Sequence, residues 1–134
     1  MLGPAYFAWR FRCLKWLRAS LFGAAALSLL LSASLVLRPR AMIRLLGVGS
    51  PEDPFYLWLS AALLACLGIL YLLASCDVRR FSPIIAVAIG AQLTLALTFF
   101  AAAQGPGTEN LIRLAGAEFL IGLGLLAFWW PVRS

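Results

Sequence analysis

Four long apolar stretches separated by short polar segments dominate the chain. A helix rises about 1.5 Å per residue, so about 20 apolar residues cross the hydrocarbon region of a bilayer. The stretches have this length, and they cover residues 19–37, 55–76, 82–103 and 109–130. The pattern therefore predicts four transmembrane helices.

Turn and capping residues separate these stretches. Asp53-Pro54 precedes the second stretch and Ser82-Pro83 opens the third, and a capping side chain followed by proline favours the start of a helix. A glycine- and proline-rich turn at 104–107 precedes Thr108-Glu109, which offers a cap and a first-turn acid to the fourth stretch. We expect a tight hairpin between the last two helices.

The N-terminal residues 1–18 mix aromatic side chains with four cations. This composition is typical of a short amphipathic helix in the membrane interface, over 5–18. The alternative is that the segment extends the first membrane helix into water. Residues 40–47 are likewise expected on the outer surface, with their apolar side chains Met42, Ile43, Leu45 and Leu46 towards lipid. The predicted fold is an all-α integral membrane four-helix bundle over 19–134, with a short amphipathic N-terminal segment.

Composition supports a membrane protein and argues against catalysis. Of 134 residues, 63% are hydrophobic and 12% charged, which is more apolar surface than a core this small can enclose. The chain has no histidine, the commonest general base and metal ligand, and it carries no phosphate-binding loop or nucleophile with a base. We expect a non-catalytic protein with no metal site.

The basic residues indicate orientation. They favour cytoplasmic termini because the N-terminal segment, the second connection and Arg133 hold more cations than the opposite side, which carries Arg38, Arg40, Arg44 and Arg113. A bacterial inner or intracytoplasmic membrane is the expected location. Nucleic acid is not an expected partner, because the basic residues behind the net charge of +6 flank the membrane spans. The residues expected to contact lipid headgroups or a partner protein are Arg10, Arg12, Lys15, Arg18, Arg79 and Arg80.

Small side chains at four-residue spacing predict where the helices pack. In lipid, close approach of small residues drives helix association. One such stripe lies in the first span and a longer one in the third; they consist of Ala24, Ser28 and Ser32, and of Ala86, Gly90, Thr94 and Thr98. We expect both stripes to face other helices of the bundle.

Glu118 is an acidic residue that lies about nine positions inside the fourth predicted span. A turn near residue 106 brings it level with Thr94 and within one turn of Gln92, so a contact among the three is expected. One interpretation is an interhelical hydrogen bond of a protonated carboxyl group. The other is a proton-linked or small-molecule site.

Residues 38–92 resemble small bacterial four-helix membrane proteins related to the DoxX-like family. The resemblance rests on Arg38-Pro39, on Leu46-Gly47, on GILYLLA at 68–74 and on DVRR at 77–80. It implies a four-helix bundle associated, as a small subunit, with respiratory or redox membrane complexes. It supplies no catalytic residue.

Two functions follow from these observations. The first is an accessory or structural subunit that packs against a larger respiratory or photosynthetic complex of electron transport. The alternative is a small transporter, or a lipid- or quinone-binding module, centred on Glu118 and Gln92. No cofactor is predicted; a bound lipid, quinone or peripheral pigment and a homo-oligomer are left open.

Overall fold

The computed structural model describes residues 4–47, 49 and 53–133, and these form an all-α membrane bundle. The helices of the described residues are α1 (Pro4–Leu37), α2 (Pro39–Leu46), α3 (Phe55–Cys76), α4 (Ser82–Ala102) and α5 (Glu109–Trp129). All except α2 are long and apolar enough to cross a membrane. The predicted fold class is confirmed, and the last three spans match to within one residue at each end.

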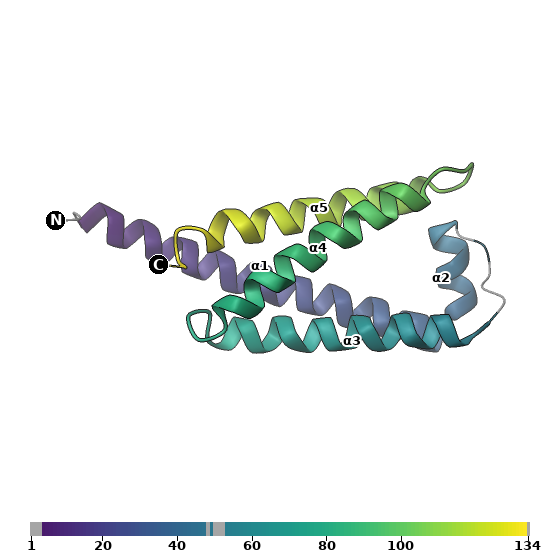
Figure 1. The fold of residues 1–134 in the computed structure, drawn as a ribbon, viewed down its shortest axis with the longest axis horizontal. Coiled ribbons are helices and arrows are strands. Elements are labelled where there is room, and N and C mark those ends of the chain that lie inside the picture. The colour runs from purple at the N-terminus through teal and green to yellow at the C-terminus, as the bar shows by residue number, and fades with distance from the viewer. Residues whose placement is uncertain (1–3, 48, 50–52, 134) are drawn as a thin grey trace.

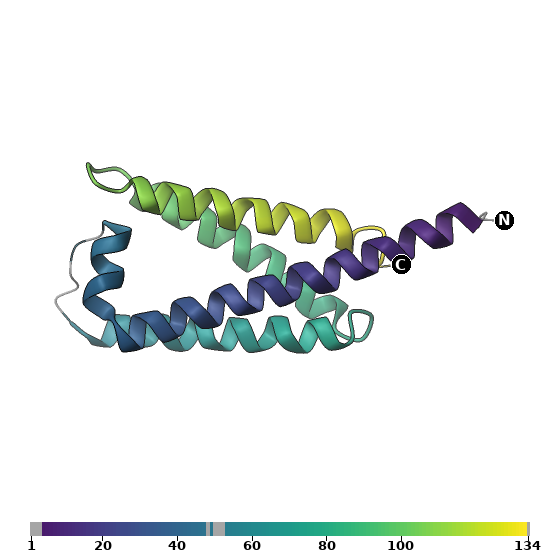
Figure 2. The same cartoon turned by 180° about the vertical axis from the view of Figure 1, so that it is seen from behind.

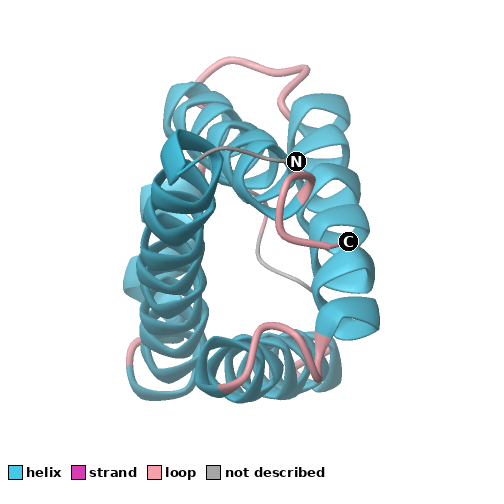
Figure 3. Cartoon of the chain, turned by 90° about the vertical axis from the view of Figure 1, so that its left-hand side faces the viewer, coloured by secondary structure: helices cyan, strands magenta, loops and turns pink. Residues whose placement is uncertain are grey.

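The four long helices run alternately up and down around a common axis (Figures 1 and 3). Both termini and the connection at 77–81 lie at one end, which we call the terminal end. The short helix α2 and the turn between α4 and α5 lie at the other, which we call the α2 end (Figure 1). Helix α1 packs along α3, and α4 packs along α5.

Helices α3 and α4 diverge. Helix α4 starts beside α3 at the terminal end and finishes beside α5 at the α2 end, as both side views show (Figures 1 and 2). Contact between α3 and α4 is accordingly more limited than within the α1–α3 and α4–α5 pairs. The divergence leaves a gap between the pairs at the α2 end.

Helix α1 is continuous, as in the alternative in which the N-terminal segment extends the first membrane helix. It runs without a break from Pro4 to Leu37. No proline follows Pro4 within it, and Cys13, Leu17 and Leu21, at four-residue spacing, all lie in the hydrophobic core. This buried stripe continues the packing face of the membrane span, so the basic segment is the extension of that helix.

Small residues bring α1 and α3 together. Ala24, Ser28 and Ser32 are buried, as their spacing predicted, and the Ser32 hydroxyl donates to the Ala61 carbonyl at 2.7 Å. A Cβ atom on Gly68 would lie 2.7 Å from Leu29 Cγ. A larger residue at that position would therefore have to displace the Leu29 side chain.

The small-residue stripe of α4 points the other way, and here the prediction was wrong. Ala86, Gly90, Thr94 and Thr98 are all exposed, and the buried residues of α4 are Ile85, Ala88, Ile89, Gln92 and Ala96. Residues two positions apart are separated by about 200° around a helix. Burying the polar Gln92 therefore turns the stripe outward. Its hydroxyls bond within α4, Thr94 to the Gly90 carbonyl and Thr98 to the Thr94 carbonyl, both at 2.9 Å.

Helix α2 crosses the α2 end and is held at its C-terminus. Gly47 follows it with a φ of +68°, and a Cβ atom there would collide with the Gly107 carbonyl oxygen. The Asn110 side-chain amide donates to the Leu45 carbonyl at 2.8 Å. Both contacts tie α2 to the α4–α5 hairpin, so α2 covers the gap between the helix pairs.

Candidate functional site

Three polar side chains meet in the interior of the bundle. Tyr71 of α3 donates its hydroxyl hydrogen to the Gln92 side-chain oxygen, and the Gln92 amide nitrogen of α4 donates to the Glu118 carboxyl group of α5. The Tyr71 hydroxyl also lies 3.4 Å from the Ala88 carbonyl oxygen. We call Tyr71, Gln92 and Glu118 the polar triad; it links three helices.

The triad residues satisfy one another. All three are at most 3% exposed, and among the described residues no buried side-chain nitrogen or oxygen lacks a hydrogen-bond partner. An unpaired polar group in hydrocarbon is costly, and these bonds remove that cost. The expected contact between Gln92 and Glu118 is present, in the form of an interhelical hydrogen bond.

Thr94 does not belong to this group, contrary to the expectation. It is exposed, and its hydroxyl bonds to the Gly90 carbonyl of its own helix. Thr94 lies two residues from Gln92 along α4 and therefore faces the opposite side of that helix.

Tyr71 was missed as a site residue. The sequence carried a signal, because a tyrosine well inside a span needs a partner for its hydroxyl. It also falls in a buried stripe of α3 formed by Ala61, Gly68, Tyr71 and Ala74, whose successive spacings of seven, three and three residues mark one helix face.

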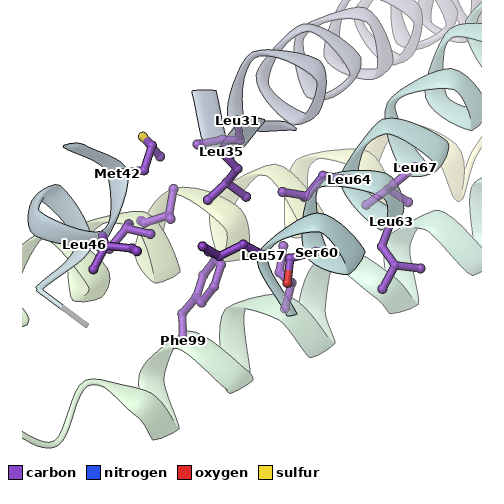
Figure 4. A pocket seen from close by; sticks show the side chains of 13 residues that line it. Leu31, Leu35, Met42, Leu46, Leu57, Ser60, Leu63, Leu64, Leu67 and Phe99 are labelled. Atoms are coloured by element: carbon purple, nitrogen blue, oxygen red, sulfur yellow. The ribbon is translucent and has the colours of Figure 1, made fainter. Parts of the chain in front are cut away.

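An apolar cavity of about 360 Å³ lies beneath α2 (Figure 4). We call it the α2 cavity. All five helices contribute to it, and twelve of its thirteen lining residues are apolar. They are Leu31, Leu35, Met42, Ile43, Leu46, Leu57, Ser60, Leu63, Leu64, Leu67, Leu95, Phe99 and Leu114.

Helix α2 covers the cavity with its apolar face. Met42, Ile43 and Leu46 line it, and Met42 is buried. The expectation that the four apolar side chains of α2 face lipid was therefore wrong for Met42, Ile43 and Leu46. Leu45, which is 56% exposed, is the exception. The docking of α2 on the α4–α5 turn accounts for the difference.

The polar triad lies one helical turn from residues that line the α2 cavity. On α3 the lining residue Leu67 precedes Tyr71 by four positions, on α4 Leu95 follows Gln92 by three, and on α5 Leu114 precedes Glu118 by four. Residues three or four apart share a helix face. The same three helix faces thus line the cavity and, one turn towards the terminal end, carry the hydrogen-bonded triad.

The α2 cavity is open to the outside of the bundle along helix α3. Ser60 is exposed and Leu63 is 61% exposed, although both line the cavity. Both belong to α3, the helix from which α4 diverges. In a membrane these positions contact lipid, so lipid chains have access to the cavity from the bilayer.

The predicted headgroup-contact residues gather at the terminal end. Arg10 and Arg79 line a surface pocket with Ser82, Val132 and Arg133. The Arg18 guanidinium donates to the Cys76 carbonyl at 3.4 Å, and the remaining members, all exposed, are Arg12, Lys15 and Arg80.

Arg133 was counted only for orientation in the sequence, but it packs closely. Its guanidinium lies 3.3 Å from the centre of the Trp130 ring. The Trp129 indole nitrogen donates to the Ser82 hydroxyl at 3.0 Å. The bond between Trp129 and Ser82 holds the end of α5 against the start of α4.

Comparisons of the chain with protein-family models, with curated proteins and with solved structures give no match. The resemblance to the DoxX-like family therefore stays a prediction. The function has to be argued from the geometry of the bundle.

Proposed function

We propose that this multi-pass membrane protein is non-catalytic and binds the acyl chain of a membrane lipid in the α2 cavity. The cavity itself carries the proposal: it is apolar, it measures about 360 Å³, and it lies within the usual size range of ligand pockets. Water is a poor occupant because the largely apolar lining offers it few hydrogen-bond partners. Lipid chains are the molecules present at its open side.

The lining favours a hydrocarbon chain over a quinone ring or a transported solute. Ser60 is the single polar residue of the lining, so a quinone carbonyl would find few partners. The polar triad lies one helical turn from the cavity lining, and its side chains are engaged in hydrogen bonds with one another. A transport path would have to pass through this network.

Two phenylalanine substitutions on α4 test the proposal. Leu95 lines the cavity, whereas Leu97 is 66% exposed on the surface of the same helix. Leu95→Phe adds bulk inside the cavity, and Leu97→Phe adds the same bulk outside it. In native mass spectra of gently solubilised protein we expect a retained lipid in the wild type and in Leu97→Phe, and its loss from Leu95→Phe. Equal retention in all three proteins would contradict the proposal.

A second candidate function is an accessory subunit of a larger membrane complex, and the exposed face of α4 favours it. Ala86, Gly90, Thr94 and Thr98 form a smooth surface with internally bonded hydroxyls, which suits close approach of another helix. The resemblance to the DoxX-like family would make that complex a respiratory or redox assembly.

Bulk added to this face tests the subunit function. Gly90→Leu should abolish a high-mass band in native electrophoresis of membranes, while Ala117→Leu, at an exposed position of α5, should retain it. A band unaffected by Gly90→Leu, or no band above the monomer in gently solubilised membranes, would reject this function.

A further inference from the structure

Helix α2 presents a basic face on the side away from the cavity. Arg40 and Arg44 are exposed and, being four residues apart, lie on one side of the helix. Met42, Ile43 and Leu46 occupy the other side and line the α2 cavity. The helix therefore has the amphipathic pattern of a segment that lies between hydrocarbon and headgroups.

The positive charge of this segment is not neutralised within it. Residues 38–47 contain three arginines and no acid. Asp53 and Glu109 are the acidic residues described at this end; the Asp53 carboxylate accepts from the Phe55 backbone N–H at 2.9 Å, and Glu109 lies in the first turn of α5. No ion pair joins either acid to Arg40 or Arg44 in the part of the chain that the structure describes.

Membrane orientation does not explain these arginines. The bundle is basic at both ends, with Arg12, Lys15 and Arg80 among the cations of the terminal end and Arg40 and Arg44 at the α2 end. The positive-inside rule accounts for cations on one side of a membrane only. Whichever end faces the cytoplasm, the other basic end needs a separate explanation.

We propose that the α2 cavity holds an anionic phospholipid, with an acyl chain among the residues beneath α2 and the headgroup on Arg40 and Arg44. The inference rests on the proposed function and adds the class of lipid. A chain that fills the cavity from its open side leaves its headgroup at the level of α2. Guanidinium groups bind phosphate oxygens by paired, charge-assisted hydrogen bonds.

The attachment of α2 makes the site rigid. The Asn110 amide holds the Leu45 carbonyl at 2.8 Å, and the close approach of Gly47 to Gly107 fixes the end of the helix. The arginine pair and the apolar side chains that cover the cavity belong to the same eight-residue helix. The arginines that bind the headgroup and the apolar side chains that contact the acyl chain thus keep a fixed position relative to one another.

Lipid titrations of the full chain test this inference. The probes are phosphatidylglycerol and phosphatidylcholine with identical acyl chains, added to delipidated protein and counted by native mass spectrometry. Because arginines near an anionic headgroup strengthen its binding, we expect the wild type to bind phosphatidylglycerol at least about tenfold more tightly than phosphatidylcholine. Arg40→Gln/Arg44→Gln should remove this preference and leave phosphatidylcholine binding unchanged, which also shows that the variant is folded.

A charge-matched control separates a local site from general attraction to anionic lipid. Arg12→Gln/Lys15→Gln removes two exposed cations at the terminal end and should keep the preference. An equal loss of preference in both double variants, or no preference in the wild type, overturns the inference.

Leu95→Phe separates the failure of this inference from that of the proposed function. If Leu95→Phe abolishes binding but the two lipids bind equally to the wild type, the cavity binds a chain and only the headgroup assignment is wrong. If Leu95→Phe leaves binding of both lipids unchanged, both proposals are wrong.

Discussion

The Gln92 amide nitrogen donates a hydrogen bond to the Glu118 carboxyl group inside the bundle and joins α4 to α5. Gln92 also accepts from Tyr71, so one side chain connects both partners. We expect Glu118→Gln to be tolerated because an amide still accepts the bond. Glu118→Leu leaves the Gln92 nitrogen unpaired and should cost about 1–2 kcal/mol, measured as unfolding of the detergent-solubilised protein. Equal stability of the two variants would contradict a structural role for the bond.

Tyr71→Phe tests the other half of the triad. Removing the hydroxyl leaves the Gln92 oxygen without its donor, and we expect a loss of about 1 kcal/mol. In a double-mutant cycle with Gln92→Leu the two losses should be less than additive, because each change breaks the same bond. Additive losses would show that the Tyr71 hydroxyl acts independently of Gln92.

Gly68 limits the distance between α1 and α3. Gly68→Ala places a methyl group against Leu29, whereas a Cβ atom on Gly23 of α1 meets nothing within 4 Å. We expect Gly68→Ala to unfold more readily than Gly23→Ala, by about 1–3 kcal/mol for the overpacked seam. Two variants of equal stability would mean that Leu29 moves aside without cost.

Gly47 fixes α2 over the cavity. Alanine is strained at a φ of +68°, and its Cβ would collide with the Gly107 carbonyl. We expect Gly47→Ala to release α2, to speed amide hydrogen exchange over 39–46 and to reduce lipid retention. Gly49→Ala, where a Cβ meets nothing within 4 Å, should do neither. Unchanged exchange in Gly47→Ala would show that the contact with Gly107 does not hold α2.

The membrane spans were predictable because every residue that faces lipid has to be apolar. Length, hydropathy and turn residues gave the last three helices to within one residue, and α1 was longer than expected because its buried stripe continues to Cys13. Helix rotation was harder to predict. On α4 the small-residue stripe and Gln92 favour opposite faces, and the hydrogen bond of Gln92 prevails.

The candidate site was predictable only in part, for a related reason. The contact between Gln92 and Glu118 follows from the equal depth of the two residues in the α4–α5 hairpin. Tyr71 belongs to α3, which lies outside this hairpin, so its contact with Gln92 could not be predicted in the same way. The α2 cavity depends on the divergence of α4 from α3 and on the docking of Gly47 against Gly107. These are relations between distant segments, and the local sequence pattern does not contain them.

Photo-cross-linking with a phosphatidylglycerol that carries a diazirine in its acyl chain tests the central claim most directly. The adducts, mapped by peptide mass spectrometry, should concentrate on residues that line the α2 cavity, such as Leu64, Leu95 and Leu114. The exposed side chains Leu97 and Leu120 serve as internal references, since they contact bulk lipid. Labelling of the cavity residues well above these references is the expected result, and labelling spread evenly over the exposed surface, with no enrichment in the cavity, would contradict it.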